Sequence, residues 1–350
     1  AGRPAASAPE PLCRKLGDDT EPPALLQEEA SWEGSGSHVW YSPDRADAIV
    51  RIGNALRARS QNLSKVLGTD RAYVTMATLC PSTRIAEPGF YLQQILVLAH
   101  SLRSVNSSLP LVVLIADLGD CDLAQQYSGR ILQESRLAFL RIPPELFKSA
   151  LLPKTTVDNW KYTYPKAYIW ALEGFSRLAF LDGDVVILQN LDDILDLPAP
   201  HGELYMATRQ GYCEKRTWED NFQGGASNLM VLRPSAQDFQ GLHQRLYDLG
   251  KAGDKSADQE IIRKLFEERL LLLPPEDMLY TNCVLQWECR LEAVRAVHLG
   301  FPGRRIVRTG AMPLRLQRHP QRQEVFLRYM ELWRSAAVQA ACEGHCAAKS

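Results

Sequence analysis

The sequence predicts an α/β protein in which a mainly parallel central sheet is flanked by helices. From Tyr73 onwards, strand-like and helix-like patterns alternate, which is typical of a parallel sheet with helical crossovers. The stretch from Ala179 to Leu188 is a nearly continuous apolar, β-branched run, as expected of a strand buried on both faces. A length of 350 residues, of which 45% are hydrophobic and 23% charged, suits one enzyme-sized domain with extensions.

The first predicted element is a helix from Pro43 to Arg59, because Ile49, Ile52 and Leu56 lie on one stripe at helical spacing. The alternating elements that follow are strands at 72–78, 110–116 and 137–142, helices at 89–104, 122–135 and 165–172, and the strand at 179–188. We expect a flexible stem at 1–42, a helical lead-in at 43–70, the main domain at 71–335 and a tail with two cysteines at 336–350.

Composition excludes some partners and favours one compartment. A formal net charge of −1 provides no excess positive charge for binding nucleic acid or an anionic membrane. No run approaches the roughly 20 apolar residues that span a bilayer, so we expect membrane attachment only through an N-terminal anchor outside this chain, which starts at Ala1. The even number of cysteines and the sequons at Asn62 and Asn106 favour disulfides and a secretory-pathway lumen such as the Golgi. The eight cysteines are Cys13, Cys80, Cys121, Cys213, Cys283, Cys289, Cys342 and Cys346.

Two carboxylates interrupt the apolar run, since only Gly183 separates Asp182 from Asp184. Ionised groups in a buried strand are costly unless they are paired or bind a cation. Residues i and i+2 of an extended chain point to the same side, so both carboxylates can converge on one ion, and Gly183 leaves room for a ligand. Oxygen ligands suit Mg²⁺ or Mn²⁺, which in turn suit a diphosphate. The alternative is an ordinary Asp-Gly-Asp turn between two strands.

Four segments of the chain together resemble a known family. They are Tyr73-Val-Thr, Leu96-Val-Leu-Ala-His-Ser-Leu-Arg, Lys166-Ala-Tyr-Ile-Trp-Ala-Leu and Phe180-Leu-Asp-Gly-Asp-Val-Val-Ile-Leu-Gln-Asn-Leu-Asp-Asp-Ile-Leu. In this order they resemble glycosyltransferase family 8, the group that contains glycogenin and the glucuronosyltransferases of plant xylan. The resemblance runs from about Tyr73 to Arg305. It implies a single Rossmann-like GT-A domain, a UDP-sugar donor, Mn²⁺ with Mg²⁺ as an alternative, and transfer with retention of configuration.

The resemblance also implies roles for single residues. Asp182, Asp184 and His298 would hold the metal ion, and Lys166 would reach the ribose and phosphates of the donor. Asp258 and Gln259 resemble the family's Asp-Gln pair beside the transferred sugar. The other residues assigned to the donor are Thr75 and Ala77 around the uracil, Tyr91 stacked on it, and Gly183, Asn228 and Gly300 lining the site. The family's Lys-Pro-Trp is absent after Gly300, and we expect Arg304 or Arg305 to bind the diphosphate in place of that lysine.

Several of these positions have plainer alternatives. Lys166 is otherwise a helix-surface lysine, Asp258 a helix cap and His298 a packed residue after an apolar strand. Two motifs depart from the family pattern. Ala226 and Asn228 stand where the family has Asn and Gly in the sugar-pocket loop, and Gly300 comes one residue early after His298.

These observations predict a metal-dependent retaining glycosyltransferase that moves a sugar from a UDP-sugar to a glycan, glycoprotein or glycolipid acceptor. A same-face transfer is expected, and a covalent path would use Asp258 as the nearest carboxylate. The alternatives are a weak or inactive family member that binds UDP or glycan, and a UDP-sugar hydrolase. The sugar, the linkage and the oligomeric state, including a homodimer, stay open.

Overall fold

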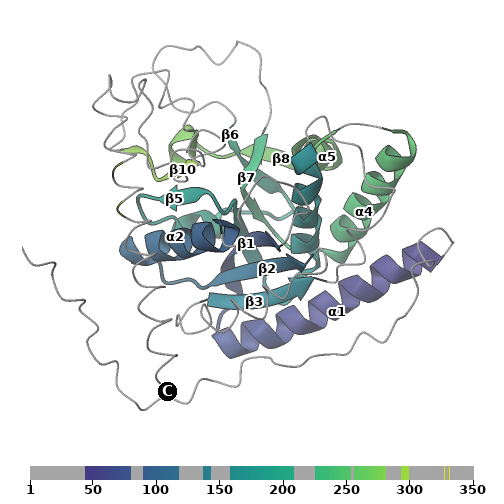
Figure 1. The fold of residues 1–350 in the computed structure, drawn as a ribbon, viewed down its shortest axis with the longest axis horizontal. Coiled ribbons are helices and arrows are strands. Elements are labelled where there is room, and N and C mark those ends of the chain that lie inside the picture. The colour runs from purple at the N-terminus through teal and green to yellow at the C-terminus, as the bar shows by residue number, and fades with distance from the viewer. Residues whose placement is uncertain are drawn as a thin grey trace, which may run out of the picture.

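The computed structural model describes residues 44–79, 90–117, 137–142, 158–208, 225–253, 256–280 and 293–298, together with positions 327 and 331. A seven-stranded sheet with the order β3-β2-β1-β4-β7-β6-β8 forms its centre (Figure 1). Among paired neighbours only β7 is antiparallel, to β4 and β6, so the predicted mainly parallel sheet is confirmed. The strands are β1 Arg71–Leu79, β2 Leu111–Asp117, β3 Leu137–Ile142, β4 Arg177–Leu181, β6 Leu204–Thr208, β7 Gly225–Leu232 and β8 Leu270–Leu272.

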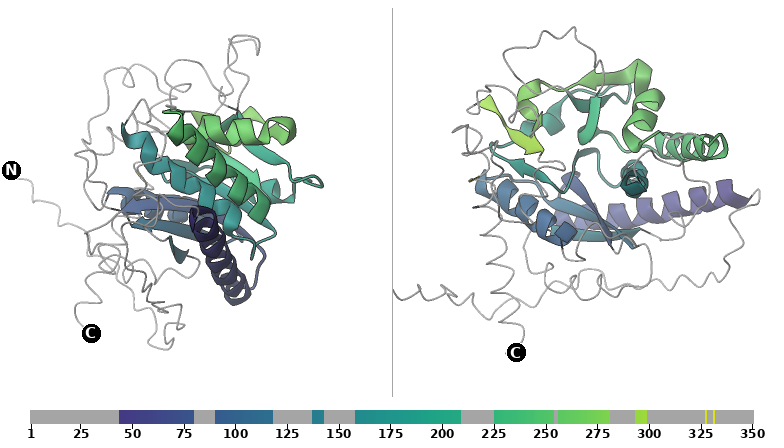
Figure 2. Two further views of the ribbon diagram at one scale, coloured as in Figure 1. Left: turned by 90° about the vertical axis from the view of Figure 1, so that its right-hand side faces the viewer. Right: turned by 45° about the horizontal axis from the view of Figure 1, so that its top comes forward.

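Side chains of the central strands alternate between two hydrophobic clusters, one on each face of the sheet. One face packs against α1 (Asp44–Leu67), η3 (Asp158–Ala171), α4 (Ala236–Lys251) and α5 (Asp258–Phe266). The other face packs against α2 (Phe90–Ser104) and the short helix η4 (Asp192–Asp196). Figure 2 shows these layers from two further sides. The helices therefore flank the sheet on both faces, as the alternating pattern predicts.

A second sheet of three short strands lies beside α2, with the order β5-β10-β9. It consists of β5 (Val185–Ile187), β9 (Leu279–Tyr280) and β10 (Ala296–His298), and β10 runs antiparallel to β5. Two further short helices, η5 (Glu267–Arg269) and η6 (Pro275–Asp277), precede β8 and β9. None of the helices in the described ranges combines the length and the apolar character needed to cross a bilayer.

The prediction of one strand from Ala179 to Leu188 is wrong. β4 ends at Leu181 in the central sheet, Asp182, Gly183 and Asp184 form a turn, and β5 begins at Val185 in the second sheet. The Val185 N–H donates to the Asp182 carbonyl at 3.1 Å, which closes the turn. Both strands are buried, so hydrophobicity alone does not distinguish a continuous strand from one that changes sheets.

Two predicted helices differ in extent. α1 continues to Leu67, eight residues beyond the predicted end at Arg59, because Leu63 extends the buried stripe. η3 begins at Asp158 and runs through Pro165, which was predicted as a helix start. Residues 164–171 of this helix are buried, so tertiary packing overrides the local signal of the proline. The predicted helix at 122–135, the stem and all eight cysteines lie outside the described residues, and the domain division stays a prediction.

α1 packs tightly against the rest of the domain. Its Ile49, Ile52 and Leu56 belong to the same buried cluster as the sheet. Arg57 forms an ion pair with Glu173, whose other oxygen accepts the Ala236 N–H at the start of α4 at 2.8 Å. The described contacts therefore join α1 to α4 and to the chain after η3.

α1 approaches the domain closely at Gly174, whose N–H donates to Ser60 Oγ at 2.9 Å. A Cβ at Gly174 would lie 2.1 Å from the Ser60 carbonyl carbon, so we expect Gly174→Ala to lower the free energy of unfolding by about 2–3 kcal/mol or more. Chemical denaturation measures this loss. Gly241→Ala in α4 is the matched control, because its Cβ would meet only Leu265 at 3.5 Å and helix propensity favours alanine by about 0.5–1 kcal/mol. Equal stability of the two variants would contradict this packing.

Candidate active site

The turn between β4 and β5 places both aspartates at the end of the central sheet. The Asp182 N–H donates to the Asn228 carbonyl of β7 at 2.9 Å, so a backbone hydrogen bond joins the turn to the antiparallel strand β7. The Asp184 side chain is almost fully buried, whereas that of Asp182 is 25% exposed. The turn that we regarded as the plainer alternative is therefore the observed structure. It nevertheless brings the two carboxylates to one place.

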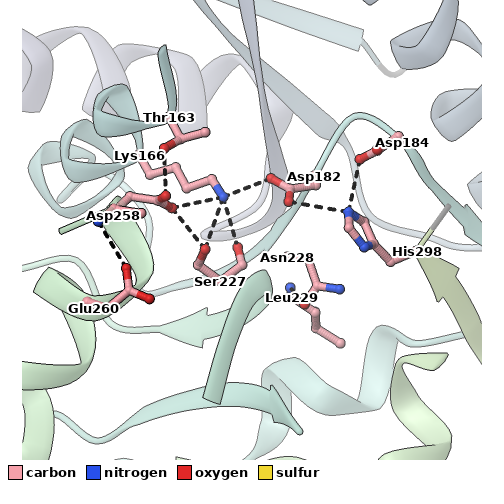
Figure 3. Close-up of polar contacts among 11 residues, drawn as sticks. Thr163, Lys166, Asp182, Asp184, Ser227, Asn228, Leu229, Asp258, Glu260 and His298 are labelled. Carbon is pink, nitrogen blue, oxygen red and sulfur yellow. Dashed lines mark hydrogen bonds and ion pairs between the residues drawn. The ribbon is translucent and has the colours of Figure 1, made fainter. Parts of the chain in front are cut away.

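His298 completes this group from a distant part of the sequence. β10 pairs with β5 so that His298 lies opposite Val185, directly after the turn. Its Nε2 lies 3.2 Å from Asp184 Oδ1 and 3.7 Å from Asp182 Oδ2 (Figure 3). One ligand atom from each of the three residues lies within 4.8 Å of the others. Two ligands at right angles around a small divalent ion are about 3 Å apart, so the three side chains fit such an ion.

Arg295 fixes the start of the strand that carries His298. Its guanidinium donates to Asp277 Oδ1 at 2.9 Å and to the Asn190 carbonyl at 2.7 Å, and it also pairs with Asp193. Its carbonyl accepts the N–H groups of Leu188 and Gln189 at 2.8 and 3.1 Å. Burial raises the pKa of Asp277, although the Arg295 charge opposes that change. These contacts fix β10 beside β5 and so set the position of the imidazole.

Lys166 is a buried cation between two carboxylates. Its Nζ lies 3.0 Å from Asp182 Oδ1 and 3.1 Å from Asp258 Oδ2, and it donates to Ser227 Oγ at 3.1 Å (Figure 3). Burial opposes the charge of Lys166, but the two aspartates raise its pKa above the usual value for lysine. The alternative of a helix-surface lysine is wrong, because only 3% of Lys166 is exposed.

Asp258 accepts hydrogen bonds from three side chains. Thr163 Oγ1 donates to its Oδ1 at 2.5 Å, and Ser227 Oγ donates to its Oδ2 at 2.9 Å, beside the Lys166 contact. Burial disfavours the charged form, yet the Lys166 charge and the two hydroxyls hold the pKa of Asp258 below its usual range. Asp258 begins α5, while the preceding Ala257 N–H is bound by Glu260 at 3.0 Å. Asp258 is thus an ionised member of the lysine cluster.

Other predicted site residues lie around the same turn. Thr75 and Ala77 are fully buried in β1, and Ala77 belongs to the apolar cluster that packs against α2. Asn228 in β7 is buried, its Oδ1 accepts the Leu229 N–H at 3.1 Å, and its Nδ2 has no hydrogen-bond partner within the described ranges. Gln259 follows Asp258 in α5 and is half-buried.

Some predicted positions have no described surroundings. The backbone of Tyr91 lies in the first turn of α2, but its side chain is outside the described part. Gly300, Arg304 and Arg305 also lie outside the described residues. Their predicted roles in binding the donor stay predictions.

Two residues of this site were not predicted from the sequence. Thr163 and Ser227 both donate to Asp258. Thr163 lies three residues before Lys166, a spacing that places both on one side of a helix, and Ser227 lies in the loop that resembles the sugar pocket. These spacings were visible in the sequence, but the need to satisfy a buried carboxylate became apparent only in the structure.

The family model described as glycosyl transferase family 8 matches residues 66–276, which is more than half of the chain. Galactinol synthase 1 of Arabidopsis thaliana is 32% identical over 157 residues, which cover 45% of this chain and 40% of that protein. Human glycogenin-2 is 28% identical over 218 residues, covering 62% of this chain and 38% of that protein. The match therefore spans less than half the length of these relatives.

Solved structures agree in fold. A galactosyltransferase, LgtC, in complex with donor and acceptor sugar analogs superposes with a TM-score of 0.52 at 15% identity, covering 75% of this chain and 95% of that chain. The glycosyltransferase GlyE of Streptococcus pneumoniae gives a TM-score of 0.50 at 18% identity, with 77% and 64% of the two chains covered. These neighbours support the GT-A fold, and the family model supports the resemblance seen in the four sequence segments. The chain therefore belongs to glycosyltransferase family 8.

Proposed function

We propose that this protein is a metal-dependent, retaining glycosyltransferase that uses a UDP-sugar donor and Mn²⁺ in the lumen of the secretory pathway. The acceptor is a glycan, a glycoprotein or a glycolipid. The observation that carries the proposal is the convergence of Asp182, Asp184 and His298 at the turn between the two sheets. The secretory setting is supported by the two sequon asparagines, Asn62 and Asn106, which are both exposed.

The charge of the cluster supports a divalent cation. The site holds three carboxylates, from Asp182, Asp184 and Asp258, and one ammonium group, from Lys166, which leaves two formal negative charges. Two carboxylates and an imidazole suit Mn²⁺ better than Mg²⁺, which prefers oxygen ligands alone. A divalent cation bound there would stabilise the charge on the departing diphosphate.

The contacts of Asp258 favour a same-face transfer over a covalent path. A carboxylate that accepts from Thr163, Ser227 and Lys166 has its lone pairs engaged and is a weak nucleophile. Asp258 therefore acts by holding Lys166 in place. Lys166 in turn orients Asp182, because it binds Oδ1 and leaves Oδ2 on the side of His298.

The decisive experiment measures UDP release from UDP-glucose, UDP-glucuronate, UDP-galactose and UDP-xylose with Mn²⁺. We expect turnover with one of these sugars, which stops with EDTA and falls by at least a hundredfold in Asp184→Ala, because a ligand of the cation is lost. Asp196→Ala is the control, since this carboxylate is 62% exposed and pairs with Arg71 at the surface.

Each other outcome of this assay has a definite meaning. Turnover without any acceptor that leaves free sugar would favour the hydrolase. Tight metal-dependent UDP binding with no turnover, even with acceptors, would favour the inactive binding protein. Failure to bind any UDP-sugar would refute the proposal.

A second prediction concerns the charge of Lys166. In metal-free buffer we expect Lys166→Met to lower the free energy of unfolding by about 3 kcal/mol, because two carboxylates lose their buried counter-ion. Saturating Mn²⁺ restores part of this loss, so the thermal shift on adding Mn²⁺ is larger in the variant than in the native chain. Differential scanning calorimetry with and without Mn²⁺ measures both effects. Lys264→Met, on the exposed side of α5, serves as the control. Equal shifts in all three proteins would place the cation elsewhere.

Gly183 provides a third test. A Cβ at Gly183 would lie 3.9 Å from Ile95 Cγ1 and 4.0 Å from Gln94 Cβ, which is ordinary contact. We therefore expect the free energy of unfolding of Gly183→Ala to stay within about 0.5 kcal/mol of that of the native chain. The affinity of this variant for UDP with Mn²⁺ should fall at least fivefold, because the methyl group occupies the space of the ligand. Calorimetric titration with UDP measures the affinity. Native affinity in this variant would show that the ligand does not approach the glycine.

A further inference from the structure

Gln94 in α2 has no assigned role, and its environment is unusual. Only 2% of the residue is exposed, yet within the described part of the chain its side-chain nitrogen Nε2 has no hydrogen-bond partner. A buried amide that has lost water and gained no partner destabilises the folded protein. A buried polar group without a partner needs an explanation, and one explanation is that the group binds a ligand.

The position of Gln94 follows from the helix that carries it. Ser101, seven residues further along, lies on the same face of α2 and accepts the Ile187 N–H at 3.1 Å. One heptad back along the helix, Gln94 Cβ lies 4.0 Å from the place where a Cβ on Gly183 would be. α2 therefore runs along β5 towards the turn. Gln94 packs against the middle residue of the turn that carries both aspartates.

Two further unsatisfied groups flank this turn within the described ranges. Thr75 Oγ1 is buried without a partner in β1, next to the end of β4, and Asn228 Nδ2 is buried without a partner in β7. The Asn228 carbonyl accepts the Asp182 N–H at 2.9 Å. Buried polar atoms without partners thus come from three elements that meet at the same turn.

We infer that Gln94 is a donor-site residue whose amide N–H binds an oxygen of the nucleoside diphosphate. This inference rests on the proposed function, because it requires a nucleotide at the Asp182–Asp184 turn. The neutral amide offers two N–H donors and suits phosphoryl or ribose oxygens. Gly183 presents no side chain between the helix and the ligand. The bond to the nucleotide then satisfies the amide that the folded chain leaves without a partner.

The test is a calorimetric titration of the full chain with UDP in saturating Mn²⁺, in parallel with thermal unfolding without ligand. In Gln94→Met and Gln94→Leu we expect the Kd for UDP to rise about fivefold to tenfold, as for the loss of one hydrogen bond. The melting temperature without ligand stays equal to or above that of the native chain, because the unsatisfied amide is gone. Gln244→Met on the exposed face of α4 makes the same chemical change and alters neither quantity.

The outcomes separate this inference from the proposed function. If the native chain binds UDP and both Gln94 variants bind it within twofold, the inference is wrong and the proposed function stands. If the native chain binds no UDP, both fail. A melting temperature that falls together with the affinity would assign Gln94 to packing. Titration with Mn²⁺ alone should be unchanged, and a parallel loss there would show that Gln94 acts through the metal ligands.

Discussion

The interaction on which this site depends is the buried ammonium of Lys166 between Asp182 and Asp258. A single buried charge would be strongly destabilising, and even a pair is stable only when further hydrogen bonds satisfy both partners. Here Thr163 and Ser227 supply those bonds to Asp258, while the Asp182 side chain remains 25% exposed. Four parts of the chain thus share one charge cluster: η3 carries Lys166, β7 carries Ser227, α5 begins at Asp258, and Asp182 directly follows β4. Displacing any of these elements would remove an ion pair or a hydrogen bond from a buried charge, so the cluster fixes their mutual positions.

The second constraint is the change of sheet at Asp182. β4 lies in the middle of the central sheet, and the chain could continue straight only by extending beyond it. The turn instead directs the next residues to β5, where β10 pairs with them in antiparallel register. That register alone places His298, more than a hundred residues later in the sequence, beside the two aspartates. Arg295 then fixes β10 through bonds to Asp277, Asp193 and the Asn190 carbonyl. The imidazole is therefore positioned by backbone pairing and by the half-buried guanidinium of Arg295, both of which are features of the fold.

The sequence predicts the layered fold and the identity of the three candidate metal ligands, because both depend on patterns that are local or carried by family motifs. The predicted strand at Leu137–Ile142 has the bounds of β3, and the helix predicted to end at Ser104 ends there. The break at Asp182 was predicted as a continuous strand, since a chain that passes from one buried sheet to another keeps the same hydrophobic run. The sequence did not predict the roles of Thr163, Ser227 and Gln94 for a different reason. Whether a hydroxyl or an amide has a hydrogen-bond partner depends on groups distant in sequence, and residue spacing does not show this.

The two oxygens of Asp182 divide the site into two parts with different chemistry. Oδ1 faces Lys166, where Ser227 and Thr163 complete a set of bonds among protein groups, and this part resembles a structural core. Oδ2 faces His298, and around that turn the atoms Thr75 Oγ1, Gln94 Nε2 and Asn228 Nδ2 are buried without partners in the described chain. Satisfied polar groups make a protein rigid, whereas unsatisfied ones lower its stability unless a ligand binds them. A site that separates the two kinds across one carboxylate has a rigid support on one side and a surface for a ligand on the other. This division explains why Asp182 is both part of the buried charge cluster and 25% exposed.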